Sequence, residues 1–289
     1  MGGMSRHRRG MVKAGRTAEG VGRRPHSHSP EEANCRMCRL LGWATRTPTS
    51  LLDLLGEGDL DAFTELSCKH ADGWGLARST REGVEVRKRP DAARASDDFA
   101  ALAHGGRSDL GLAHLRWATL GLGVGQDNTH PFSDGRMAFA HNGSISPPAS
   151  LDRLLPRRVR ELRRGDTDSE RYFLAVLARM ADGASPAEAL TTVVEEIAAT
   201  TRFTSLNCLL LTPDELYAVC RYDAAAPLRP DEGPDYFRLR YRVAGDSVVV
   251  ASSGWGRHWQ ELADGELLAV RRGSLDVSVT PIEERVAAS

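Results

Sequence analysis

Apolar residues recur along the chain in two spacings that predict different elements. In residues 169–180 and 186–199 they lie three and four positions apart, which predicts two amphipathic helices, and Pro186 is favoured at a helix start. Shorter helices are predicted over 51–55 and 60–66, joined at residues 56–58, and over 97–103. The two long helices therefore occupy the middle of the chain.

Short apolar runs bounded by Gly, Pro, Asp and Asn lie on both sides of these helices and predict strands. The predicted strands are 38–44, 73–78, 84–88, 110–117, 137–141, 206–211, 216–221, 236–243, 248–251, 267–271 and 275–279. Strands, then helices, then strands, without regular βαβ alternation, predict an α+β layered fold with mainly antiparallel sheets.

Composition narrows the class of protein. The chain has 289 residues, of which 41% are hydrophobic and 27% charged, as in a globular protein. The formal net charge of -1 gives no overall attraction to nucleic acid or anionic lipid. No stretch approaches the roughly 18 apolar residues of a membrane span. We therefore expect a cytoplasmic protein that binds neither nucleic acid nor a membrane.

The first residues differ from the rest. Residues 1–36 hold eight basic and three acidic residues and no apolar run, so residues 1–37 are predicted to be a disordered basic leader. They lack the hydrophobic segment of a secretory signal. Residues 38–272 are predicted to form the folded domain, and residues 273–289 a C-terminal strand and tail.

The chain has five cysteines, an odd number, and no export signal, which favours free thiols over a disulfide framework. Cys68, Cys208 and Cys220 lie in apolar or helical contexts typical of core residues. Cys38 directly follows Met37. In a chain that began at Met37 and lost it, the free α-amine of Cys38 would be able to take the thiol proton near neutral pH.

Three further segments carry polar groups at the ends of predicted elements. Arg116 ends a strand, where its guanidinium suits a carboxylate or a structural role. Asn142 and Gly143 follow another strand, which suits either a hairpin turn or a pair of donors for an oxyanion. Residues 166–170 precede a helix, where a Thr or Asp followed by an acidic residue suits an N-cap. Asp168 in this segment also suits a substrate ammonium. A ligand that carries a carboxylate, an ammonium and an acyl carbon would suit all three segments, and glutamine is such a ligand.

These segments, in this order, resemble the class II glutamine amidotransferases, which are N-terminal-nucleophile amidohydrolases. The matching text comprises residues 38–43, 72–75, 114–119, 129–132, 141–143 and 166–170. The resemblance covers about residues 38–272 and is greatest to short, stand-alone members such as the ergothioneine-pathway γ-glutamyl hydrolases. It implies a four-layer αββα sandwich with two antiparallel sheets.

The resemblance also implies roles for single residues. Cys38 would be the nucleophile, and Asn142 with the Gly143 N–H would form the oxyanion hole. Arg116 and Thr119 would hold the substrate carboxylate, Asp168 would hold its amine, and Trp117 would form a wall of the pocket. Where many family members carry His after the matching Thr, this chain has Leu120. No metal or cofactor is implied.

The predicted function is hydrolysis of a γ-glutamyl amide, either glutamine or a γ-glutamyl metabolite, through a cysteinyl thioester. The products are glutamate and ammonia or an amine, and ammonia would either leave or pass to a separate synthase. Because 37 residues precede Cys38, its α-amine is free only if translation starts at Met37, which is then removed, or if a propeptide is cleaved off. Two alternatives retain the leader: an inactive glutamine sensor, and a zinc-binding module using Cys35 and Cys38 with His26 and His28.

Overall fold

The computed structural model describes residues 38–68, 72–116, 125–227, 235–252 and 257–283, and these contain two antiparallel sheets. The seven-stranded sheet has the order β13-β11-β12-β1-β4-β2-β3. Its strands are β1 (Arg39–Thr49), β2 (Trp74–Ser79), β3 (Val84–Arg89), β4 (Ser108–Leu115), β11 (Leu239–Ala244), β12 (Ser247–Ala251) and β13 (Gln260–Leu262).

The second sheet has six strands in the order β15-β14-β10-β9-β6-β5. Its strands are β5 (Phe132–Ser133), β6 (Ala138–Asn142), β9 (Asn207–Leu211), β10 (Glu215–Cys220), β14 (Glu266–Arg271) and β15 (Val277–Pro281). The short strands β7 (Ile145–Ser146) and β8 (Arg202–Phe203) form a separate pair. Strand β15 pairs with β14 along its whole length.

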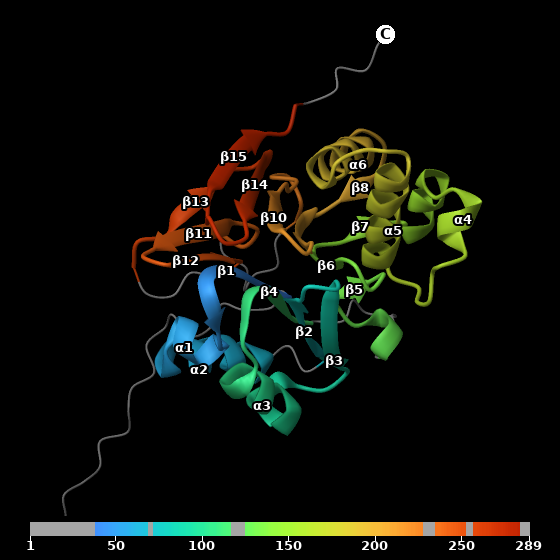
Figure 1. The fold of residues 1–289 in the computed structure, drawn as a ribbon. Helices are drawn as coiled ribbons and strands as arrows, with labels where there is room; N and C mark the ends of the chain where they lie inside the picture. The colour runs from blue at the N-terminus through green and yellow to red at the C-terminus, as the bar shows by residue number, and fades with distance from the viewer. Residues whose placement is uncertain (1–37, 69–71, 117–124, 228–234, 253–256, 284–289) are drawn as a thin grey trace, which may run out of the picture. The chain divides into compact units, whose positions relative to one another are not determined.

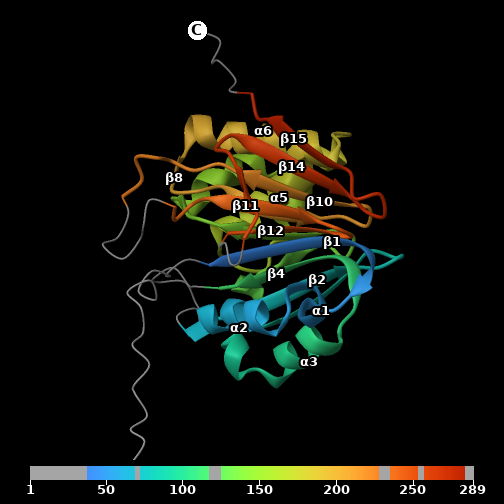
Figure 2. The same cartoon turned by 90° about the vertical axis from the view of Figure 1, so that its left-hand side faces the viewer.

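Helices cover the outer face of each sheet, as Figures 1 and 2 show. The α-helices are α1 (Leu51–Leu55), α2 (Glu57–Glu65), α3 (Asp97–Gly105), α4 (Arg157–Arg160), α5 (Asp168–Ala181) and α6 (Pro186–Thr200). The 3-10 turns are η2 (Leu66–Cys68), η3 (Ala93–Ala95), η4 (Gln126–Asn128) and η5 (Pro148–Leu154). The two long helices begin at capped residues: Thr167 caps α5, and Ser185 forms a capping box with Glu188 on α6.

Three apolar clusters hold the layers together. One joins α1, α2 and α3 to the seven-stranded sheet and includes Trp43, Phe63 and Phe99. The second lies between the two sheets, where Leu40 and Leu209 pack from opposite sides. The third joins the six-stranded sheet to α5 and α6. The layers therefore follow the order α, β, β, α, and the predicted four-layer αββα sandwich is confirmed.

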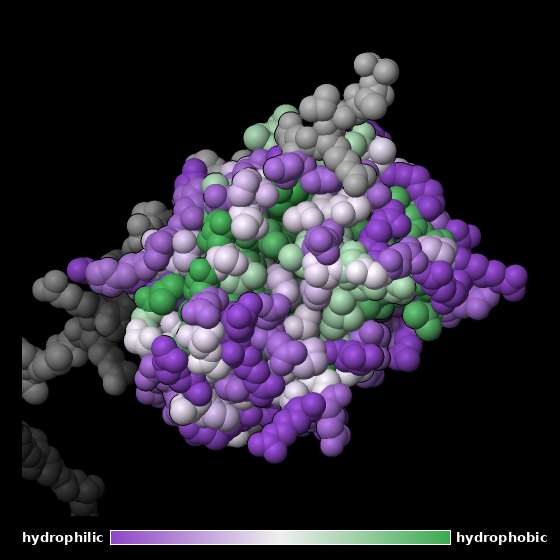
Figure 3. All heavy atoms as spheres, turned by 45° about the horizontal axis from the view of Figure 1, so that its top comes forward, coloured by the Kyte–Doolittle hydropathy of each residue, from purple (hydrophilic) through white to green (hydrophobic). Residues whose placement is uncertain are grey.

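The exposed surface is mostly polar. Figure 3 shows hydrophilic residues over most of one face, with hydrophobic residues in patches between them. Among the described residues, the exposed large apolar side chains are those of Leu162, Val243 and Val279. Scattered residues of this kind are ordinary on protein surfaces. No helix in the described ranges combines the length and apolarity that crossing a bilayer requires.

The predicted elements agree with the structure except near their ends. The joint between α1 and α2 is the single residue Gly56, because α2 already begins at Glu57. The strand predicted to run to Trp117 ends at Leu115, so Arg116 follows it. Pattern alone did not predict the two-residue strands β5, β7 and β8, nor β13, because such short segments carry no measurable periodicity.

Gly75 on β2 lies against the backbone of residues 130–131, which precede β5. A Cβ atom at this position would meet the backbone oxygen of His130 at 2.0 Å and Pro131 Cδ at 2.6 Å. We therefore expect Gly75→Ala to lower the free energy of unfolding by about 1–3 kcal/mol, the usual cost of overpacking. Urea unfolding measures this quantity.

Gly58 in α2 provides the matched control, because a Cβ there meets no atom within 4 Å. Gly58→Ala is expected to raise the free energy of unfolding by about 0.5–1 kcal/mol, since alanine favours a helix over glycine. Equal effects of the two substitutions would show that the contact between Gly75 and the His130 backbone is not tight.

Candidate active site

Strand pairing places Cys38 beside Arg116. Arg39 on β1 lies opposite Leu115 on β4, so the residue before Arg39 and the residue after Leu115 continue the same antiparallel register. Cys38 is partly exposed, whereas Arg116 is buried. Burial lowers the pKa of Arg116, and the neighbouring Cys38 and Asp72 partly oppose that shift. The thiol and the guanidinium are therefore close enough to interact electrostatically.

The backbone of residues 72–73 holds Arg116 in this position. The Arg116 N–H donates to the oxygen of Gly73 at 2.7 Å, and Arg116 Nη1 donates to the oxygen of Asp72 at 3.2 Å. Five guanidinium N–H groups are available to an arginine, so this contact leaves donors for another acceptor. The turn before β2 thus supports Arg116 while leaving it able to bind a carboxylate.

Asn142 and Gly143 end β6 on the other sheet. Asn142 is 1% exposed, and its Nδ2 atom makes no hydrogen bond within the described residues. A buried amide donor without a partner is costly, and such groups are kept where a ligand completes them. A Cβ at position 143 would meet the backbone oxygen of Ser205 at 2.0 Å, so this position requires glycine.

Asp168 is the first residue of α5 and is buried. Its Oδ2 accepts from the N–H of Ile145 at 2.7 Å, and its Oδ1 accepts from the N–H of Ser169 at 2.9 Å. The side chain that caps the helix is that of Thr167. A carboxylate has about four lone-pair positions, so Asp168 keeps acceptor capacity for an ammonium.

His141 lies between Asn142 and α5 and is fully buried. Its Nε2 lies 2.9 Å from the backbone oxygen of Ser205, which only accepts, so Nε2 carries the hydrogen. Its Nδ1 lies 2.9 Å from Ser169 Oγ and accepts from that hydroxyl. Burial lowers the pKa of His141, and Asp168 partly opposes the shift. The neutral ring therefore ties the end of β6 to the start of α5.

His130 lies close to site residues from both β4 and β6. Its ring centroid lies 4.2 Å from that of His114 on β4, and its nitrogens make no hydrogen bond in the described part of the chain. Burial lowers its pKa well below the ordinary value, and nearby His114, His141, Arg116 and Lys88 lower it further. Groups from β4 and β6 therefore converge on one buried, neutral ring.

Lys88 supports the segment that contains His130. Its Nζ donates to the backbone oxygens of Thr129 at 2.6 Å and Pro131 at 3.2 Å. Burial lowers the pKa of Lys88 to about 8. Sequence reasoning missed this residue, although Val84, Val86 and Lys88 alternate along one face of β3 and so mark Lys88 as inward-facing.

Several sequence predictions cannot be placed. Trp117 and Thr119 lie outside the described residues, as do Cys35, His26 and His28 of the zinc alternative. The described ranges hold no group of three or more His, Cys, Asp or Glu side chains able to bind a metal ion. Cys208 and Cys220 are buried in the core, as predicted, and burial raises the pKa of each thiol to about 12.

Comparison with known proteins identifies the family. The fold is that of the N-terminal-nucleophile amidotransferases, and the class II glutamine amidotransferase family matches residues 37–232. The chain therefore belongs to the class II glutamine amidotransferases and is an enzyme of that amidotransferase and amidohydrolase kind.

Two curated relatives differ in how much of them the chain covers. The γ-glutamyl-hercynylcysteine sulfoxide hydrolase of Mycolicibacterium smegmatis is 29% identical over 258 residues, which cover 85% of this chain and 100% of that protein. The glutamine–fructose-6-phosphate aminotransferase of Gluconobacter oxydans is 28% identical over 163 residues, covering 56% of this chain and 25% of that protein.

A solved structure shows the same fold. The glutamine aminotransferase class-II domain protein from Silicibacter pomeroyi aligns with a TM-score of 0.60 at 22% sequence identity. The alignment covers 84% of this chain and 99% of that one. At this identity the likeness concerns the fold alone.

The Asn142 amide and the Asn207 amide allow a matched test, because these residues lie opposite each other on β6 and β9. Asn207 donates to the oxygen of Phe237 and accepts from the N–H of Arg221, so Asn207→Ala should cost about 1–3 kcal/mol of unfolding free energy. Asn142→Ala should cost less, because Nδ2 has no partner to lose.

Activity should respond in the opposite order. If Asn142 donates to the oxyanion, Asn142→Ala lowers kcat by about 10²–10³-fold. Urea unfolding and glutamate release, measured on both variants, separate the two effects. A large loss of stability with normal kcat in Asn142→Ala would assign this amide to the core.

Proposed function

We propose that the chain hydrolyses γ-glutamyl amides through a thioester on Cys38. The observation that carries this proposal is the combination of Cys38 beside the buried Arg116 with an unpartnered buried amide on Asn142. Transfer of a glutamyl group from an amide to a thiol requires a nucleophile, a group that binds the substrate carboxylate, and a hydrogen-bond donor to the oxyanion.

In this mechanism the α-amine of Cys38 takes the thiol proton, and the sulfur attacks the γ-carbonyl carbon of the substrate. The oxyanion that forms accepts hydrogen bonds from Asn142 Nδ2 and the Gly143 N–H. The C–N bond then breaks, and the leaving nitrogen receives the proton held by the α-amine. Water attacks the thioester, its proton passes to the amine, and glutamate leaves with the Cys38 thiol restored.

The glutamyl end is held by charges of opposite sign. We assign the α-carboxylate to Arg116, with Thr119 as a second partner and Trp117 as a wall of the pocket. The α-ammonium is assigned to Asp168, whose oxygens retain lone pairs after accepting from Ile145 and Ser169. Because neutral His141 adds no positive charge beside Asp168, it does not compete with the substrate ammonium.

The proposal requires that Cys38 be the first residue of the active protein, since an amide nitrogen cannot serve as the base. A family match that begins at residue 37 supports a start at Met37, followed by its removal. Cleavage of a propeptide after Met37 would also leave Cys38 as the first residue. The cytoplasmic location and the boundaries 1–37, 38–272 and 273–289 stay predictions.

For the leaving group we favour the amine of a small γ-glutamyl metabolite. The relative that supports this choice is the Mycolicibacterium hydrolase, whose whole length the chain covers, whereas the chain spans a quarter of the Gluconobacter aminotransferase. The second candidate is glutamine, with ammonia passed to a separate synthase. Glutamate release from each compound, compared by kcat/KM, distinguishes the two.

The role of Cys38 as the nucleophile can be tested by substitution. In a chain begun at Met37, Cys38→Ala should reduce glutamate release from glutamine and from γ-glutamyl amides to background, because no other group forms the thioester. Cys220→Ala removes a buried thiol elsewhere and should retain measurable activity. Turnover by Cys38→Ala near the parent rate would refute the proposal.

Arg116 and Asp168, the two charged groups assigned to the substrate, can be tested in the same way. Arg116→Ala and Asp168→Asn should each raise KM by about 10–100-fold with a smaller change in kcat, as expected when uniform binding to a charged group is lost. Steady-state kinetics with glutamine measures both constants. A fall in kcat alone would mean that these residues act on the transition state instead.

A further inference from the structure

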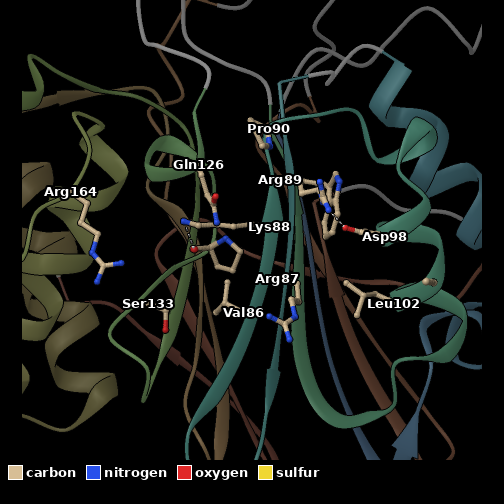
Figure 4. A pocket seen from close by; sticks show the side chains of 13 residues that line it. Val86, Arg87, Lys88, Arg89, Pro90, Asp98, Leu102, Gln126, Ser133 and Arg164 are labelled. Atoms are coloured by element: carbon tan, nitrogen blue, oxygen red, sulfur yellow. Dashed lines mark hydrogen bonds and ion pairs between the residues drawn. The ribbon is translucent and has the colours of Figure 1, made fainter.

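A cavity lined by residues of β3 and α3 lies apart from the residues of the proposed active site. Its volume is about 830 Å³, within the range of small-molecule sites, and most of its lining side chains are charged or polar. Its lining includes Lys88 and Val86 of β3, Gln126 of η4, and Arg164 before α5 (Figure 4). The lining includes none of Cys38, Arg116, Asn142 and Asp168.

The cavity runs along an open strand edge. Strand β3 is the last strand of its sheet, and its Val84 N–H donates outward to the oxygen of Gly135 at 3.1 Å. Backbone groups of alternate residues in an antiparallel strand point the same way, so the N–H groups of Val86 and Lys88 also point away from β2. The edge therefore offers backbone donors to a ligand in the cavity.

Positive side chains dominate the lining. The lining holds Arg87, Lys88, Arg89 and Arg164 and one carboxylate, that of Asp98. Arg87 pairs with Glu85, which is not among the lining residues. Asp98 pairs with Arg89 on the α3 side, and Figure 4 shows Lys88 extending the other way, toward Arg164 and Gln126. The lining on that second side holds two cations and no carboxylate; the Asp127 and Glu170 carboxylates, which interact with Lys88 electrostatically, lie outside the lining.

Arg164 is held in place by its backbone and not by its side chain. Its N–H donates to Glu170 Oε1 at 2.8 Å, while its guanidinium makes no ion pair in the described part of the chain. Lys88 uses two of its three N–H groups on the Thr129 and Pro131 oxygens, which leaves one for a ligand. Both cations therefore have donors that the protein does not satisfy.

A plain explanation is that charged residues protect an open strand edge from pairing with other chains. Residues with that role extend into solvent, but Lys88 turns inward, 5.3 Å above the Phe132 ring, and Arg164 is not on an edge strand. Protection of the strand edge therefore does not explain why the Lys88 and Arg164 side chains line the same cavity.

We propose that this cavity binds a small organic or inorganic anion bearing phosphate or multiple carboxylate groups. Arg164 and Lys88 supply the charged contacts, with Gln126 and the open edge of β3 as neutral donors. Fork-shaped guanidinium donors suit both of these anions. The site goes beyond the proposed hydrolysis and takes no part in the chemistry at Cys38.

The occupant would contact both segments that lead to the active site. Lys88 donates to the backbone of residues 129–131, which include His130. Glu170, two residues after Asp168, accepts hydrogen bonds from the N–H groups of Arg164 and Gly165. An anion bound at Lys88 and Arg164 therefore takes no part in catalysis but lies next to the segments that hold His130 and Asp168.

The test titrates the full chain with inorganic pyrophosphate and, separately, with citrate by calorimetry at constant ionic strength. We expect saturable binding of at least one anion, and the preferred anion identifies the phosphate or carboxylate source. Arg164→Ala should weaken it about tenfold, the equivalent of one charge-assisted contact. Arg81→Ala removes an exposed arginine outside the cavity and should leave affinity within twofold.

Glutamate release by Arg164→Ala at the parent rate shows that the variant is folded and separates this test from that of the proposed function. Two results would overturn the anion site: no saturable heat with either anion up to millimolar concentration, or equal weakening by Arg164→Ala and Arg81→Ala. The second result would mean that any surface charge serves as well as Arg164.

Discussion

The antiparallel pairing of β1 with β4 is the constraint on which the site depends. It sets Arg39 opposite Leu115, and so brings the residue at the start of one strand beside the residue after the other. A shift of one position would also move Leu40 and Leu112 out of the layer between the sheets, so the same burial that stabilises the sandwich fixes the register. The position of Cys38 against Arg116 is thus a consequence of core packing.

Burial explains the charge state of the surrounding groups. Burial lowers the pKa of both His130 and His141; nearby positive groups lower that of His130 further, whereas Asp168 partly opposes the shift at His141. Arg116 remains a cation, although burial lowers its pKa, because guanidinium pKa values begin very high. In the proposed site, Arg116 supplies a positive charge for a carboxylate, and Asp168, the first residue of α5, supplies a carboxylate for an ammonium.

Sequence patterns predicted the layers well because each long element has a clear periodicity. They predicted Asn142 and Gly143 as a pair at a strand end, but not that Ser205 would press against Gly143, since that contact joins residues far apart in the chain. Lys88 was missed for a related reason. One lysine in an alternating strand resembles any edge charge until the loop that it binds, residues 129–131, is placed beside it. Residues 166–170 were located by their place before a helix, and Thr167 caps α5, whose first residue is Asp168.

The central claim is that a γ-glutamyl group becomes attached to the sulfur of Cys38 when that residue is the first of the chain. The most direct measurement is mass spectrometry of peptides from enzyme quenched during turnover of a γ-glutamyl amide. The account predicts a γ-glutamyl adduct on the peptide whose first residue is Cys38. An adduct on another side chain, or active enzyme in which Met37 still precedes Cys38, would contradict it.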